Sequence, residues 1–319
     1  MTTTKTAARG VGEGGGGRPS VTAIVPSRGR PELLRRAVDS IVSQDYEGSI
    51  ECLIVYDGDE EPPPLASGRA DRPVRTLRNR RAPGAAGARN DGALIATGEL
   101  LAFCDDDDEW LPHKLRLQVE ALGERPEAAV ITSGIYVCYR GRTDARVPEG
   151  TTVSFAGLLR SRRSDMHTST FVVRRSEFLG RLGPFDESIP GSFGEDYEFL
   201  LRASRFAPLA TVPEPLVRVY WHESSWFAEQ WDTLVQAMTY LLARYPEFAR
   251  DRRGSARIHG QIAFAHAAAG RRRHSFRRAL ESLRLDPRQP RAYLALAVAS
   301  GAFSAESVLA QLRRRGRGI

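Results

Sequence analysis

The amino-acid sequence predicts an α/β fold in which helices cover both faces of an open, mostly parallel β-sheet. Short, near-continuous apolar runs recur at residues 21–26, 50–56 and 99–104, and such runs are typical of parallel strands buried on both faces. Segments with helical periodicity separate them, and this alternation favours a parallel sheet. The 319 residues allow one large domain or two smaller ones.

The first predicted elements are a tail, a strand and a helix. Residues 1–19 are rich in glycine and low in apolar residues, so we expect them to be disordered. A short strand follows at residues 21–26. The helix predicted over residues 31–44 starts with Pro31, which suits a first helical turn. Its apolar residues recur on one face, namely Leu33, Leu34, Ala37, Val38, Ile41 and Val42.

The next elements lead to an unusual acidic segment. The run at residues 50–56 reads as a strand that Asp57 and a glycine end, and residues 74–79 read as a third short strand. A glycine-punctuated helix is predicted over residues 84–98. The strand predicted at residues 99–104 runs directly into four consecutive aspartates.

The segment "LLAFCDDDDEW" places the carboxylates of Asp105, Asp106, Asp107 and Asp108 directly after this strand. Each close pair of them repels by roughly 4 kcal/mol at about 4 Å in a medium of effective dielectric near 20. A solvated loop would screen this repulsion. However, ligands bind beyond the carboxyl ends of parallel strands, where the loops "SRGR" and "DGDEE" also end. Since Mg²⁺ binds carboxylates together with substrate phosphates, we expect a divalent cation and a diphosphate at this edge.

The charge and the apolar content of the chain indicate which binding partners and which location to expect. The formal charge is +7 and the sequence pI is near 9.6, which would suit nucleic acid, an anionic membrane or a phosphorylated molecule as partner. Much of the excess is arginine in the last third, and no nucleic-acid-reading motif occurs, so we expect no nucleic acid partner. No apolar run is long enough to span a bilayer, and the start is unlike a signal peptide. We therefore expect a cytoplasmic protein.

Three cysteines lie inside apolar runs without metal-ligand spacing, namely Cys52, Cys104 and Cys138. We expect reduced core residues rather than disulfides.

Four motifs, in order, resemble those of family-2 inverting glycosyltransferases with the GT-A fold. They are "VTAIVPSRGRPELLRRAVDSIVSQDY", "LIVYDGD", "GAAGARNDGALIATGELLAFCDDDDEW" and "FGEDYEFLLR". The resemblance covers residues 20–225, which we take as the GT-A domain. It implies an EC 2.4 transferase that moves a sugar from a nucleotide diphosphate donor, a UDP-sugar by expectation, with inversion. It also implies a divalent metal, Mn²⁺ or Mg²⁺. The acceptor stays open between a glycan, a lipid-linked molecule and a small molecule.

The resemblance assigns the nucleotide-binding residues. Pro26, Ser27 and Arg28 match the turn beside base and ribose, although the family commonly has tyrosine where Arg28 stands. Asp57 matches the second carboxylate of a pair that contacts the base, while Tyr56 replaces the first. Asp57 also fits a simple Asp-Gly turn.

Within the acidic run, the resemblance makes Asp107 the metal ligand and places Asp105 or Asp106 at the ribose or the metal's water shell. Asp108 and Glu109 could instead cap the helix predicted over residues 111–122, because acids favour a helix N-terminus. We expect Trp110 to be a core or lid aromatic.

In "GSFGEDYEFLLRAS", Glu195 and Asp196 begin an amphipathic helix, and both could simply cap it. The resemblance makes Asp196 the catalytic base. An inverting transferase needs one carboxylate, which takes the acceptor's proton. Glycoside hydrolases need two catalytic carboxylates, so the sequence gives little support to a hydrolase.

Two histidines are weaker candidates. His167, with Thr168, could approach the acceptor or the diphosphate, although a histidine at a strand start also suits a structural role. His222 follows an apolar run, and related enzymes sometimes use such a histidine on the metal.

From residue 226 to 319 the sequence predicts successive helices with arginine-rich faces. One segment faintly resembles a tetratricopeptide unit, but a single copy makes no solenoid. The basic faces could meet solvent, an acidic partner or an anionic membrane as a peripheral contact. The alternative to the enzyme is a non-catalytic adaptor that keeps a degenerate glycosyltransferase domain beside these helices, and the intact Asp107 and Asp196 argue against it.

Overall fold

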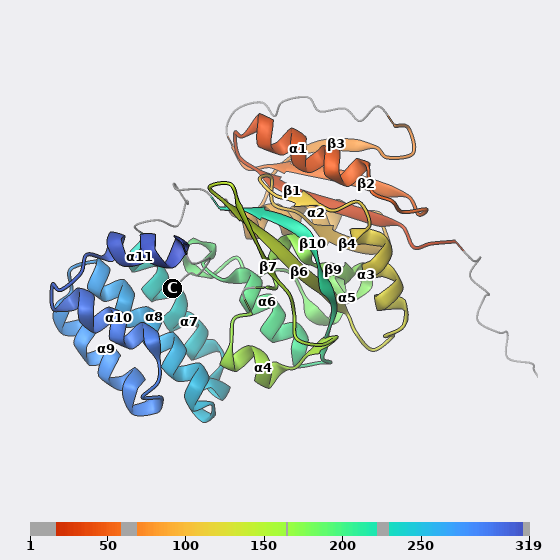
Figure 1. Cartoon of the computed structure of the whole chain (residues 1–319). Helices are drawn as coiled ribbons and strands as arrows, with labels where there is room; N and C mark the ends of the chain where they lie inside the picture. Colours follow the sequence, from red (N-terminus) through yellow and green to blue (C-terminus); the bar gives the residue numbers. More distant parts are fainter. Residues whose placement is uncertain (1–16, 59–68, 164, 222–229, 315–319) are drawn as a thin grey trace, which may run out of the picture.

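A computed structural model describes residues 17–58, 69–163, 165–221 and 230–314 of the chain (Figure 1). The strands and helices of the first half are β1 (Val21–Ser27), α1 (Pro31–Val42), β2 (Ile50–Tyr56), β3 (Val74–Arg78), α2 (Ala85–Ile95), β4 (Leu100–Phe103), β5 (Glu109–Trp110), α3 (Lys114–Gly123), β6 (Val130–Tyr139), β7 (Arg142–Arg146), β8 (Thr152–Val153) and α4 (Phe155–Arg160). Those of the second half are β9 (Val172–Arg174), α5 (Arg175–Glu177), α6 (Glu195–Ser204), β10 (Leu209–Tyr220), α7 (Trp231–Arg244), α8 (Arg252–Ala268), α9 (Arg272–Leu285), α10 (Pro290–Ala299) and α11 (Ala305–Arg314).

The strands form one mixed, mostly parallel sheet in the order β3-β2-β1-β4-β9-β6-β10-β5. Strands β3, β2, β1 and β4 are parallel, as predicted. Val21 of β1 is in register with both Ile50 and Leu100, so these strands end at one edge of the sheet. Strand β9 runs antiparallel between β4 and β6. Its three residues are too few to show a periodicity. The strand expected to start at His167 begins only at Val172, after a short 3₁₀ turn.

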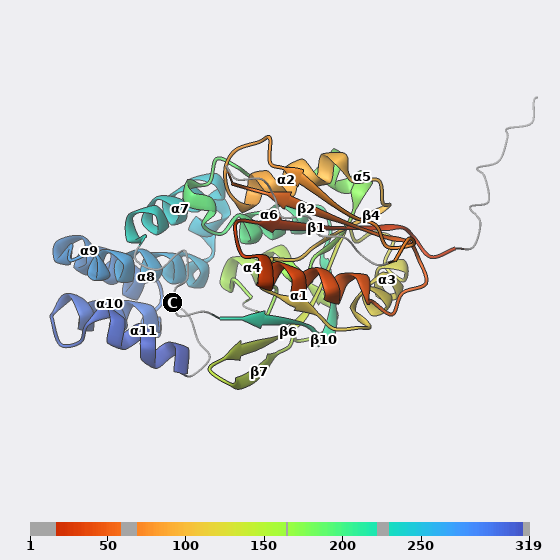
Figure 2. The ribbon, with the colours of Figure 1, turned by 90° about the horizontal axis from the view of Figure 1, so that it is seen from above.

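Helices cover both faces of the sheet, which confirms the predicted fold class. Figure 2 shows α1 and α2 on opposite sides of β1 and β2. Helices α1 and α3 pack on one face in a core that includes Leu34, Ile41 and Leu115. Helix α2 lies close to the other face because it carries Gly92, where a Cβ would come within 2.7 Å of Ile24 Cγ2. This close approach fixes the position of α2 beside the acidic loop.

The C-terminal helices α7 to α11 lie beside the sheet (Figure 1). Helix α8 begins at Arg252, after the side chain of Asp251 caps it by accepting from the Gly254 N–H. The main core beside the sheet continues into this region through Met238, Leu241 and Ile258, among others. The division at residue 226 stays a prediction.

Helices α7 to α11 confirm the successive helices predicted for the C-terminal region. Within the described ranges, no helix combines the length and the hydropathy needed to cross a lipid bilayer. The three cysteines are free thiols, Cys52 and Cys104 buried and Cys138 partly buried. The tail predicted over residues 1–19 lies mostly outside the described residues.

Candidate functional site

The loops after β1, β2 and β4 meet at one edge of the sheet, as the sequence predicts. The Asp57 N–H donates to the Ser27 carbonyl oxygen at 2.8 Å. The Ser27 hydroxyl donates to Asp106 Oδ2 at 2.8 Å. The predicted nucleotide turn and the predicted acidic loop are therefore in direct contact.

Two of the four aspartates share one arginine. Arg30 pairs with Asp106 and, through Nη1 at 2.7 Å, with Asp107 Oδ2. The side chain of Asp106 is almost fully buried, and burial raises its pKa. Burial and the neighbouring carboxylates of Asp108 and Asp105 raise the pKa of Asp107. The Arg30 guanidinium thus offsets part of the repulsion within the acidic run.

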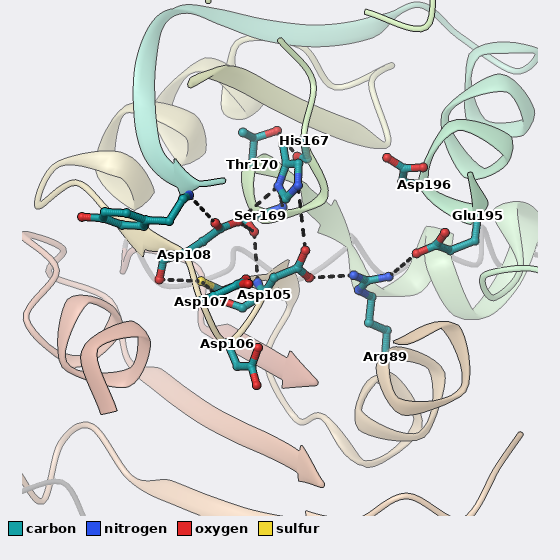
Figure 3. Close-up of polar contacts among 12 residues, drawn as sticks. Arg89, Asp105, Asp106, Asp107, Asp108, His167, Ser169, Thr170, Glu195 and Asp196 are labelled. Atoms are coloured by element: carbon teal, nitrogen blue, oxygen red, sulfur yellow. Dashed lines mark hydrogen bonds and ion pairs between the residues drawn. The ribbon is translucent and has the colours of Figure 1, made fainter. Parts of the chain in front are cut away.

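The other two aspartates lie beside His167 (Figure 3). His167 Nδ1 is 3.3 Å from Asp108 Oδ2, and Nε2 is 3.9 Å from Asp105 Oδ2. The Ser169 hydroxyl also donates to Asp108 Oδ2 at 2.5 Å. Burial lowers the pKa of His167, but Asp108 and Asp105 outweigh it and raise that pKa to about 9.

Asp105, Asp108 and His167 are spaced to hold a metal ion. One ligand atom from each lies within 4.8 Å of the other two. Two carboxylate oxygens and an imidazole nitrogen suit a divalent cation of the Mn²⁺ type. The residues present therefore fit the metal that the fold family implies, although the family motif points to Asp107.

Arg89 of α2 joins the acidic loop to α6. Its Nη2 is 2.6 Å from Asp105 Oδ1, and its Nη1 is 2.7 Å from Glu195 Oε1 (Figure 3). The Arg89 side chain is 3% exposed. Burial opposes the charge of Arg89, but the two carboxylates outweigh it and raise its pKa. The same pairing, with His167, lowers the pKa of Asp105 against its own burial.

Asp196 lies in the first turn of α6, as predicted. Arg162 Nη2 is 3.0 Å from Asp196 Oδ1 and 3.1 Å from Oδ2. The Tyr197 N–H donates to Asp196 Oδ1 at 2.8 Å. Burial raises the pKa of Asp196, but Arg162 and this N–H outweigh it and lower the pKa below its ordinary value. Asp196 is therefore ionised at neutral pH.

Asp57 organises the corner between β2 and α2. Its Oδ1 accepts from Asn79 Nδ2 at 2.7 Å and its Oδ2 accepts from the Gly84 N–H at 2.8 Å. Both oxygens thus have partners within the chain, and these partners lie in the segment between β3 and α2 rather than in the turn at Asp57 itself. The predicted contact of Asp57 with the base stays a prediction.

The remaining predicted residues are less informative. Pro26 is partly buried in β1, and Arg28 is exposed in the turn after it. His222 lies outside the described residues. Thr168 is buried next to His167 in a short 3₁₀ turn. The roles assigned to all of these stay predictions.

The suggestion that Asp108 and Glu109 cap the following helix is wrong. Helix α3 starts only at Lys114, with His113 at its N-cap position. Glu109 instead belongs to β5, where its carboxylate pairs with Arg36 at 2.6 Å. Residues 111–113, predicted as the first residues of this helix, form a turn between β5 and α3.

Trp110 is a core residue, as expected. It is 3% exposed, and its indole N–H donates to the Ser169 carbonyl oxygen at 3.0 Å. The amine of buried Lys114 lies 4.1 Å from the centroid of its ring, and burial lowers the pKa of that amine to about 7.

Sequence reasoning missed three arginines, Arg30, Arg89 and Arg162, that pair with the acids. Arg89 had a detectable signal, since it is the one long side chain in the small-residue segment "GAAGARNDG". Arg30 and Arg162 sit in arginine-rich loops, where nothing in the sequence singles out one guanidinium.

Known proteins resemble this chain in sequence. A family model described as glycosyl transferase family 2 matches residues 22–180. The O-antigen biosynthesis protein RfbC of Myxococcus xanthus is 30% identical over 236 residues, which cover 66% of this chain and 18% of RfbC. The chain spans less than half the length of several curated relatives that it matches.

Solved structures of low sequence identity share the fold. S. aureus TarS 1-349 in complex with UDP-GlcNAc superimposes with a TM-score of 0.59 at 14% identity, covering 93% of this chain and 92% of TarS 1-349. The mannosyltransferase PcManGT of Pyrobaculum calidifontis, in complex with GDP-Man and Mn²⁺, has a TM-score of 0.53 at 21% identity, covering 92% and 79% of the two chains.

Proposed function

The chain contains a glycosyl transferase family 2 domain with the GT-A fold, whose members are inverting enzymes, and from this premise we propose that it transfers a sugar from a nucleotide diphosphate donor to an acceptor. Asp196 is the general base in this proposal, and the loop of Asp105 to Asp108 receives the donor with a divalent cation.

One observation carries the proposal. Arg89 contacts both Asp105 and Glu195 at 2.6–2.7 Å, so the predicted donor loop and the predicted base helix lie on either side of one guanidinium. Asp105 and Glu195, which are distant in the sequence, therefore lie close together around the Arg89 guanidinium. An inverting transferase needs this arrangement, because base and leaving group act on opposite sides of one sugar carbon.

In this proposal, different residues of the chain bind the donor, accept the proton and hold the metal. Ser27, Asp105 and Asp106 bind the nucleoside part of the donor. Asp196 accepts the proton of the attacking hydroxyl, and Arg162 with the helix N-terminus keeps it ionised beforehand. Asp107, or the group of Asp105, Asp108 and His167, would hold Mn²⁺ or Mg²⁺, which when bound neutralises charge on the departing diphosphate.

The test separates catalysis from binding. Release of the nucleotide diphosphate is measured beside calorimetric affinity for UDP with Mn²⁺, for wild type, Asp196→Asn and the matched variant Glu195→Gln. Asp196→Asn should lower the rate by about 10²- to 10⁴-fold while affinity is kept. Normal turnover in Asp196→Asn with collapse in Glu195→Gln would transfer the role to Glu195. Loss of affinity in both would make the pair structural, and absence of release with any donor would favour the adaptor.

We propose a UDP-sugar as the donor. The support is the fold shared with TarS, which was solved with UDP-GlcNAc, whereas PcManGT was solved with GDP-Man. Thermal shift with UDP, GDP and dTDP sugars in the presence of Mn²⁺ decides between them, because a ligand that binds only the folded state raises the melting temperature. A larger shift with GDP-mannose would contradict the uridine donor.

We also propose that the C-terminal region contacts an anionic membrane surface. Residues 230–314 contain 15 arginines and six acidic residues, a formal charge of +9 against +7 for the whole chain. One exposed stripe of α9 carries Arg273, Phe276, Arg277, Leu280 and Arg284 at helical spacing. Apolar side chains between arginines suit a bilayer interface better than a soluble polyanion.

Vesicle sedimentation tests this contact. Wild type should bind vesicles containing phosphatidylglycerol and not pure phosphatidylcholine, and the double variant Phe276→Ser with Leu280→Ser should bind more weakly. Equal binding of wild type and the double variant would contradict a role for the stripe.

A further inference from the structure

The two residues that follow Asp196 in α6 are buried and are held by the C-terminal helices. Tyr197 is 2% exposed and Glu198 is fully buried. Each hydrogen-bonds to a side chain from beyond residue 230. The first turn of α6 is therefore connected to a region that the proposed chemistry does not use.

The first connection runs through Arg257 of α8. Its Nη2 donates to the Tyr197 hydroxyl at 2.7 Å, and its guanidinium lies 5.2 Å from the ring centroid. The Tyr197 hydroxyl donates in turn to the Leu158 carbonyl oxygen at 2.7 Å. Arg257 is 6% exposed. The hydroxyl of Tyr197 is thus fixed from two sides.

The second connection runs through Tyr245, which ends α7. Its hydroxyl donates to Glu198 Oε1 at 2.7 Å, and Tyr245 is 1% exposed. Glu198 also pairs with Arg202 one turn later, at 2.9 Å. The carboxylate of Glu198 is therefore shared between α6 itself and the C-terminal region.

Two glycines contribute to this region, Gly194 through its backbone conformation and Gly254 through close packing. Gly194 immediately precedes the acid pair with a positive φ of 85°, and a Cβ there would lie 3.8 Å from Met238 Cε of α7. Gly254 of α8 meets the Leu159 carbonyl oxygen, which would lie 2.4 Å from an added Cβ. Helix α8 thus packs directly on the backbone of α4, the helix whose Leu158 carbonyl oxygen accepts from the Tyr197 hydroxyl.

We propose that α7 and α8 position the acid pair of α6, with Arg257 and Tyr245 as positioning residues for Asp196. The inference rests on the proposed function, in which Asp196 is the base. A displacement of about 1 Å at a reacting group can lower a rate by about 100-fold. Two buried hydrogen bonds to the residues after Asp196 limit such a displacement.

The test is a set of kinetic measurements on the full chain. Arg257→Met and Tyr245→Phe should each lower kcat for release of the nucleotide diphosphate by about 10- to 100-fold. The KM for the donor and the affinity for UDP with Mn²⁺ should stay unchanged, because the donor loops follow β1, β2 and β4. Arg257→Lys should recover part of kcat, since an ammonium can still donate to the Tyr197 hydroxyl.

Matched controls come from the same region. Arg278→Met removes a guanidinium whose carboxylate partner is Glu281, and Tyr293→Phe removes a hydroxyl that donates to the Pro287 carbonyl oxygen. Both should keep kcat.

Three outcomes overturn the inference. These are normal kcat in both Arg257→Met and Tyr245→Phe, an equal fall in kcat in the controls, or a parallel loss of kcat and UDP affinity. Asp196→Asn is measured alongside: its normal turnover would reject Asp196 as the base, which is the part of the proposed function on which the inference rests, whereas an inactive Asp196→Asn beside normal positioning variants rejects only the inference.

Discussion

Replacing Arg89 by methionine should destabilise the protein strongly. The substitution keeps a long side chain and leaves the carboxylates of Asp105 and Glu195 without their shared cation. Arg89 is 3% exposed and the Glu195 side chain 9% exposed, whereas Asp105 is 25% exposed, so water can replace the guanidinium only in part at Asp105 and hardly at Glu195. Removal of one partner from a buried pair costs about 3–5 kcal/mol.

Arg30→Met is the matched control for this loss. Arg30 also bridges two aspartates, but 46% of its side chain is exposed, Asp107 is 20% exposed, and the buried Asp106 keeps the Ser27 hydroxyl as a donor. Solvent and this remaining hydrogen bond should limit the cost to about 1 kcal/mol. For 319 residues, 1 kcal/mol corresponds to about 1.5 °C in melting temperature. We expect a fall of about 5–8 °C for Arg89→Met and less than about 2 °C for Arg30→Met.

The pH dependence gives a second readout. In wild type the pKa of Asp105 is held below its ordinary 3.8, so its stabilising contribution is present above about pH 4 and is lost only in stronger acid. In Arg89→Met, burial without the cation raises the pKa values of Asp105 and Glu195. Both then protonate in weak acid, and the difference in unfolding free energy from wild type should shrink below about pH 5.

Urea unfolding followed by circular dichroism at pH 7 and pH 4.5 measures both effects. A loss below about 1 kcal/mol, a loss no larger than that of Arg30→Met, or a difference that grows in acid would refute the reasoning.

Three further predictions follow from the same site. Asp107→Ala should abolish Mn²⁺-dependent UDP binding in calorimetry and leave the circular dichroism spectrum unchanged, and unaltered affinity would exclude Asp107 from the metal site. His167→Asn, measured with a chelator present, should be less stable than wild type below about pH 6.5, and this difference should disappear as the pH rises through about 9; a difference that is constant with pH would contradict the pairing. Gly87→Ala should cost roughly 1–3 kcal/mol in urea unfolding, because a Cβ would lie 1.9 Å from the Ala82 carbonyl oxygen, whereas Gly123→Ala, with open space around it, should be nearly neutral.

The part of the fold that was predictable has strong local signals. The runs that became β1, β2 and β4 are apolar throughout most of their length, and the helices between them have clear periodicity or a proline start. Strand β9 and strand β5 lack such signals because they have three and two residues. Their pairing depends on contacts across the sheet, which a local pattern does not contain.

The candidate site, too, was predictable only in part. The acidic residues were predicted because Asp105 to Asp108 follow a predicted strand and the pair Glu195–Asp196 begins a predicted helix. At such positions a carboxylate can bind a ligand or cap a helix. Their arginine partners were not found, since Arg162 meets Asp196 only through folding of a loop 34 residues away. Pairing across such separations depends on tertiary geometry.

The internal ion pairs of the acidic loop have a consequence for how the protein is made. The carboxylates of Asp105 to Asp108 each have a positively charged or hydroxyl partner within the chain itself. Folding therefore does not require a bound cation, and the chain should fold equally well in the presence of a chelator. In the proposed function, loading of the ion would be a late event that coincides with arrival of the substrate, whose phosphates would supply the remaining ligands. A cell short of manganese would then accumulate folded, idle protein rather than aggregated chains.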